Sequence, residues 1–162
     1  MKERLIRVAD WAVDAGEDVA LVTLGLGSCV ALVLYDAQAH AGGLAHLLLP
    51  SPSMARDRSN PGRFAETVLP LLLGRMAAAG AERERITARL VGGASMFGAT
   101  ASAPGPIAMG ERNVVAARQV LAAAQVPVVA EDVLKNYGRS VYFFLDDGRV
   151  EVRTVARGTV VL

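Results

Sequence analysis

The feature that most constrains the fold of this sequence is a long uncharged stretch that glycine interrupts. Residues 19–35 contain no charged side chain, but Gly25, Gly27 and Ser28 break the stretch in its middle. A membrane-spanning helix needs about 20 mostly apolar residues that stay helical, so the stretch favours two buried strands joined by a tight loop. Residues 90–110 are also uncharged and contain several glycines and two prolines. We therefore expect both stretches to form buried strands and loops, with no membrane insertion.

The other patterns in the chain predict a layered α/β sandwich of the α+β class, formed as a single domain over residues 1–162. Short runs rich in β-branched residues predict about eight strands, which follow one another more often than they alternate with helices. This order is typical of a mixed or mostly antiparallel sheet with two or three helices. Residues 64–79 and 111–125 have helix-forming composition, and Pro70 is expected to kink the first helix or split it in two.

Composition and charge exclude several classes of protein. The sequence has 17 Lys and Arg residues against 16 Asp and Glu residues, a net charge of +1 and no long basic run, so we expect no nucleic-acid partner. One cysteine cannot form an internal disulfide, and the charged first residues do not resemble a secretory signal, so we expect a cytoplasmic protein. The polar segment 51–63 is a candidate substrate-facing loop, although its three arginines are more simply explained as solvated surface.

Cys29 is the most reactive type of side chain in the sequence and occurs once. A free cysteine is often only a small buried hydrophobic residue. Cys29, however, follows the glycine-punctuated segment 24–28, where the backbone N–H groups of Gly27 and Ser28 could stabilise a developing oxyanion. The glycines lack the spacing of a dinucleotide-binding fingerprint, and no P-loop lysine-serine pair occurs, so we expect no cofactor.

Of the two histidines, His46 is the candidate partner of Cys29. His40 lies among small residues and is most simply an exposed turn residue, whereas His46 lies in an apolar predicted strand, where a buried ring needs a polar partner. Thr23 is a third candidate because its hydroxyl or carbonyl could orient an imidazole, although threonine is also common in strands. Two histidines without a second cysteine do not form a convincing zinc site, so we expect no metal.

Whether Cys29 and His46 meet depends on where a predicted hairpin turns. If residues 29–35 and 44–49 pair through a turn centred on residues 37–38, Cys29 and His46 are directly opposed, with Cβ atoms about 5 Å apart. A turn at the Gly-Gly pair that follows would place His46 opposite a different residue, and the pair would fail. Spacing alone leaves both alternatives open.

Six short motifs occur along the chain in a fixed order. They are TLGLGSCVA at residues 23–31, YD at 35–36, GGLAH at 42–46 with LP at 49–50, GGASMF at 92–97, GERN at 110–113 and GR at 138–139. In this order they resemble the chemoreceptor glutamine deamidase family, CheD. The resemblance runs from about residue 5 to about residue 155, so it is specific and covers nearly the whole chain.

The resemblance implies a catalytic triad formed by Cys29, His46 and Thr23. Such a protein-glutamine deamidase attacks a glutamine carboxamide with the cysteine thiolate, releases ammonia with a proton from the histidine, and hydrolyses the thioester to glutamate. The implied partners are the cytoplasmic helices of a chemoreceptor and a CheC-type phosphatase. The alternative is a non-catalytic chemotaxis adaptor that binds and modulates that phosphatase.

One segment departs from the family pattern. After Asp132 and Val133 the family usually carries a Gly-Gly pair, and this chain has Leu134 and Lys135. If the glycines serve a special backbone conformation, the two larger residues change the loop and the docking of partners near it.

Overall fold

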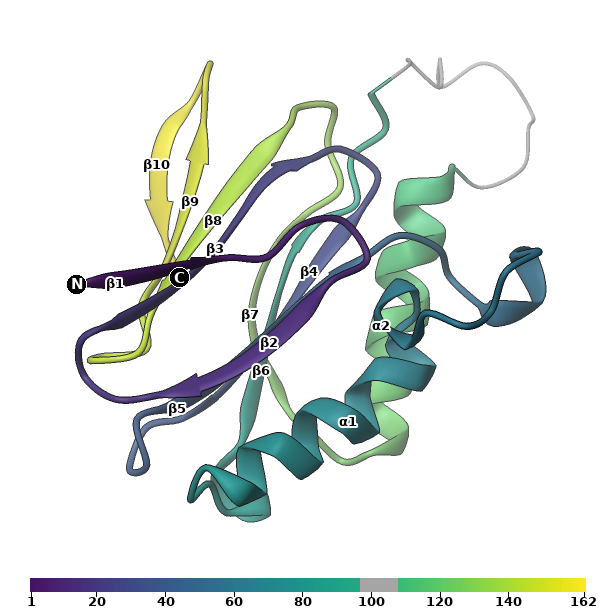
Figure 1. Ribbon diagram of the computed structural model, residues 1–162. Helices are drawn as coiled ribbons and strands as arrows, with labels where there is room; N and C mark the ends of the chain where they lie inside the picture. The colour runs from purple at the N-terminus through teal and green to yellow at the C-terminus, as the bar shows by residue number, and fades with distance from the viewer. Residues whose placement is uncertain (97–107) are drawn as a thin grey trace.

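The computed structural model describes residues 1–96 and 108–162, which form two five-stranded sheets stacked face to face, with two helices over one of them (Figure 1). The first sheet has the order β1 (Lys2–Leu5), β3 (Val19–Leu26), β8 (Arg139–Phe144), β9 (Val150–Thr154) and β10 (Gly158–Val161). The second sheet has the order β2 (Trp11–Ala15), β5 (Ala41–Leu47), β4 (Val30–Asp36), β6 (Thr87–Gly92) and β7 (Val128–Val133). The helices are α1 (Ala65–Ala78) and α2 (Met109–Ala123), and short 3₁₀ turns occupy Pro52–Met54, Pro61–Arg63 and Arg83–Arg85.

Both sheets are mixed. The pairs β1 with β3 and β6 with β7 are parallel, and the other neighbouring strands of each sheet are antiparallel. The architecture is therefore an α+β layered sandwich, which confirms the predicted class. Within the described residues no helix combines the length and apolar character needed to cross a membrane.

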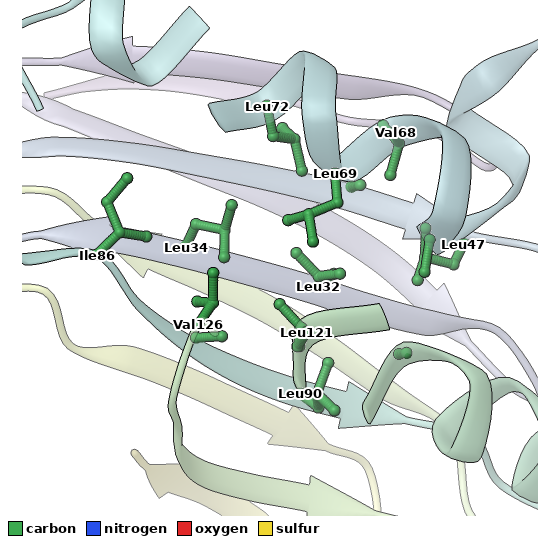
Figure 2. Close-up of a cluster of buried hydrophobic side chains, with 14 of the residues drawn as sticks. Leu32, Leu34, Leu47, Val68, Leu69, Leu72, Ile86, Leu90, Leu121 and Val126 are labelled. Carbon is green, nitrogen blue, oxygen red and sulfur yellow. The ribbon is translucent and has the colours of Figure 1, made fainter. Parts of the chain in front are cut away.

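The central strand β4 separates two hydrophobic cores. All seven of its residues are buried, because β5 and β6 flank it and both faces are covered. Leu32 and Leu34 face the helices, where they pack with Leu69 of α1 and Leu121 of α2 (Figure 2). The alternate residues, such as Val33, face the first sheet. Each buried leucine contributes about 1.5–3 kcal/mol to stability, so this double-sided core fixes the position of β4 and of the segment that precedes it.

Several predicted boundaries needed correction. Pro70 was expected to kink the first helix or split it in two, and the second alternative is wrong, since α1 runs continuously from Ala65 to Ala78. Pro70 lies in the second turn on the exposed side, where water can satisfy the carbonyl that loses its partner. The described residues contain ten strands and not eight, and β10 was missed because all of its residues are exposed and it has no buried face to detect. The loop predicted at residues 24–28 is shorter, because β3 continues to Leu26 through an irregularity in its pairing with β8.

Candidate functional site

The hairpin of β4 and β5 places His46 opposite Ala31, not opposite Cys29. Neither predicted turn is observed: the turn takes residues 37–40, and Asp36 Oδ1 holds it by accepting two of its backbone N–H groups. His46 is therefore paired two residues further along β4 than direct opposition to Cys29 would require. Cys29 directly precedes β4, and no hydrogen bond joins it to His46 Nε2 among the described residues. If the alternation of β4 is extended by one residue, Cys29 lies on the face that His46 occupies, as a diagonal neighbour, for which about 7–8 Å separates the Cα atoms.

Thr23 and His46 form a buried hydrogen bond between the two sheets. Thr23 lies in β3 of the first sheet, His46 lies in β5 of the second, and both are fully buried. Thr23 Oγ1 is 2.7 Å from His46 Nδ1 and 2.6 Å from the backbone carbonyl oxygen of Ile6. The carbonyl can only accept, so the threonine hydroxyl donates to Ile6 and must accept from Nδ1–H. This arrangement fixes the neutral histidine as the Nδ1–H tautomer and leaves a lone pair on Nε2.

The Nε2 atom of His46 is buried and has no hydrogen-bond partner among the described residues. Burial also lowers the pKa of His46 below its ordinary value, because a charged imidazolium is costly away from water. The ring is therefore neutral near pH 7, and its free lone pair is a base. An unpartnered buried polar atom costs stability, which is typical of a functional position.

Cys29 lies between the end of β3 and the start of β4. Its side chain is partly buried against the core between the two sheets, and burial raises the pKa of its thiol. Its carbonyl oxygen accepts a hydrogen bond of 2.8 Å from the N–H of Gly93. Gly92 packs so closely against the same carbonyl that a Cβ atom there would overlap it, and the φ of Gly92 is +112°. The segment around Cys29 is therefore held in place by backbone contacts.

A cavity of about 420 Å³ adjoins the segment before Cys29. Gly27 and Ser28 form part of its wall, and residues 94–96 and 108–110 form the rest. The N–H groups of Gly27, Ser28 and Cys29 donate no hydrogen bond to any described residue. They are therefore available as donors to a bound molecule. Phe97, which belongs to one of the sequence motifs, lies outside the described residues.

The segment that departs from the family pattern keeps an unusual backbone. Leu134 and Lys135 both adopt the left-handed region, with φ values of +67° and +66°. Two backbone hydrogen bonds hold these residues. The Leu134 N–H donates to the carbonyl of Gly92 at the end of β6, and the Ser95 N–H, in the cavity wall, donates to the carbonyl of Lys135. The loop thus takes a conformation that glycine adopts with less strain, at the cost of two strained larger residues.

Arg139 and Asn113 belong to two of the sequence motifs, had no role predicted for them, and are buried near this site. Arg139 is buried, and its guanidinium hydrogen-bonds to Asp132 and to the carbonyl of Leu134. Asn113 of α2 is buried and donates to carbonyls on both sides of the β4–β5 hairpin. Asn113 could have been found, since it lies next to Val114 on the apolar face of a predicted helix, where a buried amide needs partners. The described residues contain no cluster of three or more His, Cys, Asp or Glu side chains that could hold a metal ion.

A solved structure shares the fold of this chain, and a family model matches most of its sequence. Over 99% of the chain the fold resembles the crystal structure of Neisseria meningitidis protein NMB0706, with a TM-score of 0.53, 17% identity and coverage of 73% of that chain. A family model described as CheD chemotactic sensory transduction matches residues 48–154.

Curated relatives extend the match over the beginning of the chain. A protein of Caldanaerobacter subterraneus subsp. tengcongensis is 41% identical over 160 residues, which are 98% of each chain. A protein of Moorella thermoacetica is 40% identical over 96% of this chain and 93% of its own, and one of Pyrococcus horikoshii is 39% identical over 99% and 98%. All three are named probable chemoreceptor glutamine deamidase CheD. The chain belongs to the CheD family, as its motifs predicted.

Proposed function

We propose that this protein is a protein-glutamine deamidase that converts chemoreceptor glutamine side chains to glutamate and releases ammonia. In this proposal residues 1–162 form one deamidase domain, with Cys29 as nucleophile, His46 as base and Thr23 as the residue that orients the imidazole. The observation that carries the proposal is the His46 ring, whose Nδ1–H is bound by Thr23 and whose Nε2 lone pair is buried without a partner among the described residues. The names of the relatives supply the substrate class.

The resting site holds a neutral thiol and a neutral imidazole, because burial raises the pKa of Cys29 and lowers that of His46. Proton transfer therefore accompanies attack: Nε2 takes the thiol proton as the sulfur adds to the carboxamide carbon. The imidazolium then returns this proton to the leaving nitrogen, and ammonia departs as the thioester forms. Water attacks the thioester with Nε2 again acting as base, and glutamate and the free thiol are released.

Thr23 performs the part that a carboxylate performs in other triads. Its hydroxyl is committed as a donor to Ile6, so only its oxygen lone pair faces the ring. This holds Nδ1 protonated and leaves the Nε2 lone pair to act as the base. The uncharged partner also stabilises an imidazolium less than a carboxylate would.

Backbone donors near Cys29 supply the oxyanion site in this proposal. The N–H groups of Gly27 and Ser28 are free of partners among the described residues, and both residues line the cavity. Fixed donors of this kind stabilise the tetrahedral intermediate without reorganisation, and removal of one donor in other enzymes costs about 10²–10³ in kcat.

The substrate in this proposal is the cytoplasmic helical region of a chemoreceptor, and the protein acts in the cytoplasm. A CheC-type phosphatase is the proposed second partner. No cofactor or nucleic acid takes part in the mechanism, since the nucleophile, the base and the water account for every bond made and broken.

The test is mass spectrometry of a purified receptor cytoplasmic fragment incubated with the protein. The wild type should replace –NH₂ by –OH at specific glutamines and release an equal amount of ammonia. Cys29→Ala should abolish both changes and should retain binding to the fragment. A wild type that binds receptor or phosphatase but never alters the mass of the receptor would overturn the enzymatic proposal in favour of the adaptor.

A further inference from the structure

The N-terminus of α2 lies unusually close to the strand ends around Cys29. A Cβ atom at Gly110, in the first turn of α2, would overlap the carbonyl oxygens of Gly93 and Ala94. Only glycine permits this approach. One helical turn later, the same close packing brings the side chain of Asn113 to the backbone of the β4–β5 hairpin.

Asn113 joins the two strand ends that carry Cys29 and His46. Its Nδ2 donates to the carbonyl oxygen of Ser28 at 2.9 Å and to that of Leu48 at 3.2 Å. Ser28 directly precedes Cys29, and Leu48 follows His46 by two residues. The last ladder pair of the hairpin is Val30 with Leu47, so the amide joins the two strands beyond their backbone pairing, two residues before Val30 and one residue after Leu47.

The bond to Ser28 also sets the direction of the next N–H group. In a planar trans peptide the carbonyl of Ser28 and the N–H of Cys29 point in opposite directions. With the carbonyl held toward α2 by Asn113, the Cys29 N–H is directed away from the helix, and it has no acceptor among the described residues. One side chain therefore fixes the orientation of a donor beside the thiol.

The burial of Asn113 is explained by its hydrogen bonds and not by apolar packing. The residue is 2% exposed, and its Oδ1 is buried without a partner among the described residues. An apolar side chain would fill the same place without the unpaired Oδ1, but it would take the amide donor away from the carbonyls of Ser28 and Leu48. The amide is thus explained by its two Nδ2 hydrogen bonds and not by helix packing.

We propose that Asn113 is a positioning residue, which sets the separation of Cys29 from His46 and the orientation of the Cys29 N–H. This inference rests on the proposed function, since it assigns Asn113 to the Cys29 and His46 pair. The GERN motif at residues 110–113 then has a physical reason: Gly110 allows the approach of the helix, and Asn113 uses it.

Alkylation of Cys29 by iodoacetamide measures this positioning directly, because the protein has no other cysteine. The rate is followed against pH for the wild type, His46→Ala, Asn113→Ala and the uncharged, similarly shaped Asn113→Leu. His46→Ala should move the alkylation profile to higher pH, since no base accepts the thiol proton. Both Asn113 variants should move it the same way, and kcat for glutamine deamidation should fall by up to about a hundredfold with KM little changed, as expected for a misplacement near 1 Å.

Leu121→Val, which changes a buried residue two turns along the same helix, is the control for loss of stability alone and should leave the profile in place. If His46→Ala leaves the profile unchanged, the proposed Cys–His pair fails. If His46→Ala moves the profile and the folded Asn113 variants do not, the positioning role of Asn113 is overturned. Asn113→Leu keeps the branched shape of the side chain without adding a charge or a donor, and so decides the question if Asn113→Ala does not fold.

Discussion

Replacing Lys135 by glycine should raise the free energy of unfolding by about 0.5–1 kcal/mol. Lys135 has a φ of +66° and an exposed side chain, so its left-handed backbone is strained without a packing gain. A left-handed conformation costs a residue with a Cβ atom about 1–2 kcal/mol. Glycine removes this strain but gives the unfolded chain more freedom, which offsets about 0.4–1 kcal/mol. The hydrogen bond from the Ser95 N–H to the carbonyl of residue 135 is retained.

Urea unfolding of the wild type, Lys135→Gly and Lys135→Ala measures the change in the free energy of unfolding, and the m-values of the three proteins should be equal. Lys135→Ala removes the same side chain but keeps the Cβ atom and the strain, so it should give no increase. Leu134→Gly relieves the same strain at a φ of +67° but loses a side chain packed against the helix-side core, so its gain should be smaller or negative. An alanine variant as stable as the glycine variant would show that backbone conformation is not the cause.

Two further substitutions test the buried polar groups. Thr23→Val should lower the free energy of unfolding by about 2–4 kcal/mol, because it leaves the carbonyl of Ile6 and the Nδ1–H of His46 unpaired. The same variant should lower kcat at least about a hundredfold, whereas Thr23→Ser should retain most of the stability and of the kcat. Urea unfolding measures the first effect, and ammonia release measures the second. Burial raises the pKa of Asp36, but the Arg85 guanidinium and three backbone N–H groups outweigh it and hold that pKa below its usual value. The stabilisation by ionised Asp36 should therefore be present above about pH 4 and lost as the pH falls further. In unfolding experiments, the free energy of unfolding of the wild type should exceed that of Asp36→Asn by an amount that shrinks between about pH 5 and pH 2. A difference that does not depend on pH would contradict this assignment.

Much of the sandwich could be predicted because burial leaves a pattern in the sequence. The continuous apolar run of β4 indicates a strand covered on both faces, and the structure has it at the centre of the second sheet. The strand β10 could not be predicted, since its exposed residues depend on pairing with β9 and not on a buried face. The helix α1 continues through Pro70 because the proline lies on the exposed side, which a single sequence does not reveal directly.

The candidate site was predictable to the level of residue types but not of register. Thr23 and His46 were both singled out, and the structure joins them by a hydrogen bond. Spacing left open whether Cys29 and His46 are directly opposed. The structure excludes direct opposition, because Asp36 holds a four-residue turn and a change of two residues decides which side chains are opposed. The acceptor at Ile6 is a backbone carbonyl, and no side-chain pattern could have indicated it.

The hydrogen bond between Thr23 and His46 crosses from one sheet to the other, so the orientation of the base depends on how the two sheets are stacked. A small separation of the layers would break this bond while every strand and helix kept its own backbone pairing. On heating, deamidation should therefore decline before far-ultraviolet circular dichroism reports any loss of secondary structure. The stacking of the sheets would then limit the working temperature of the protein.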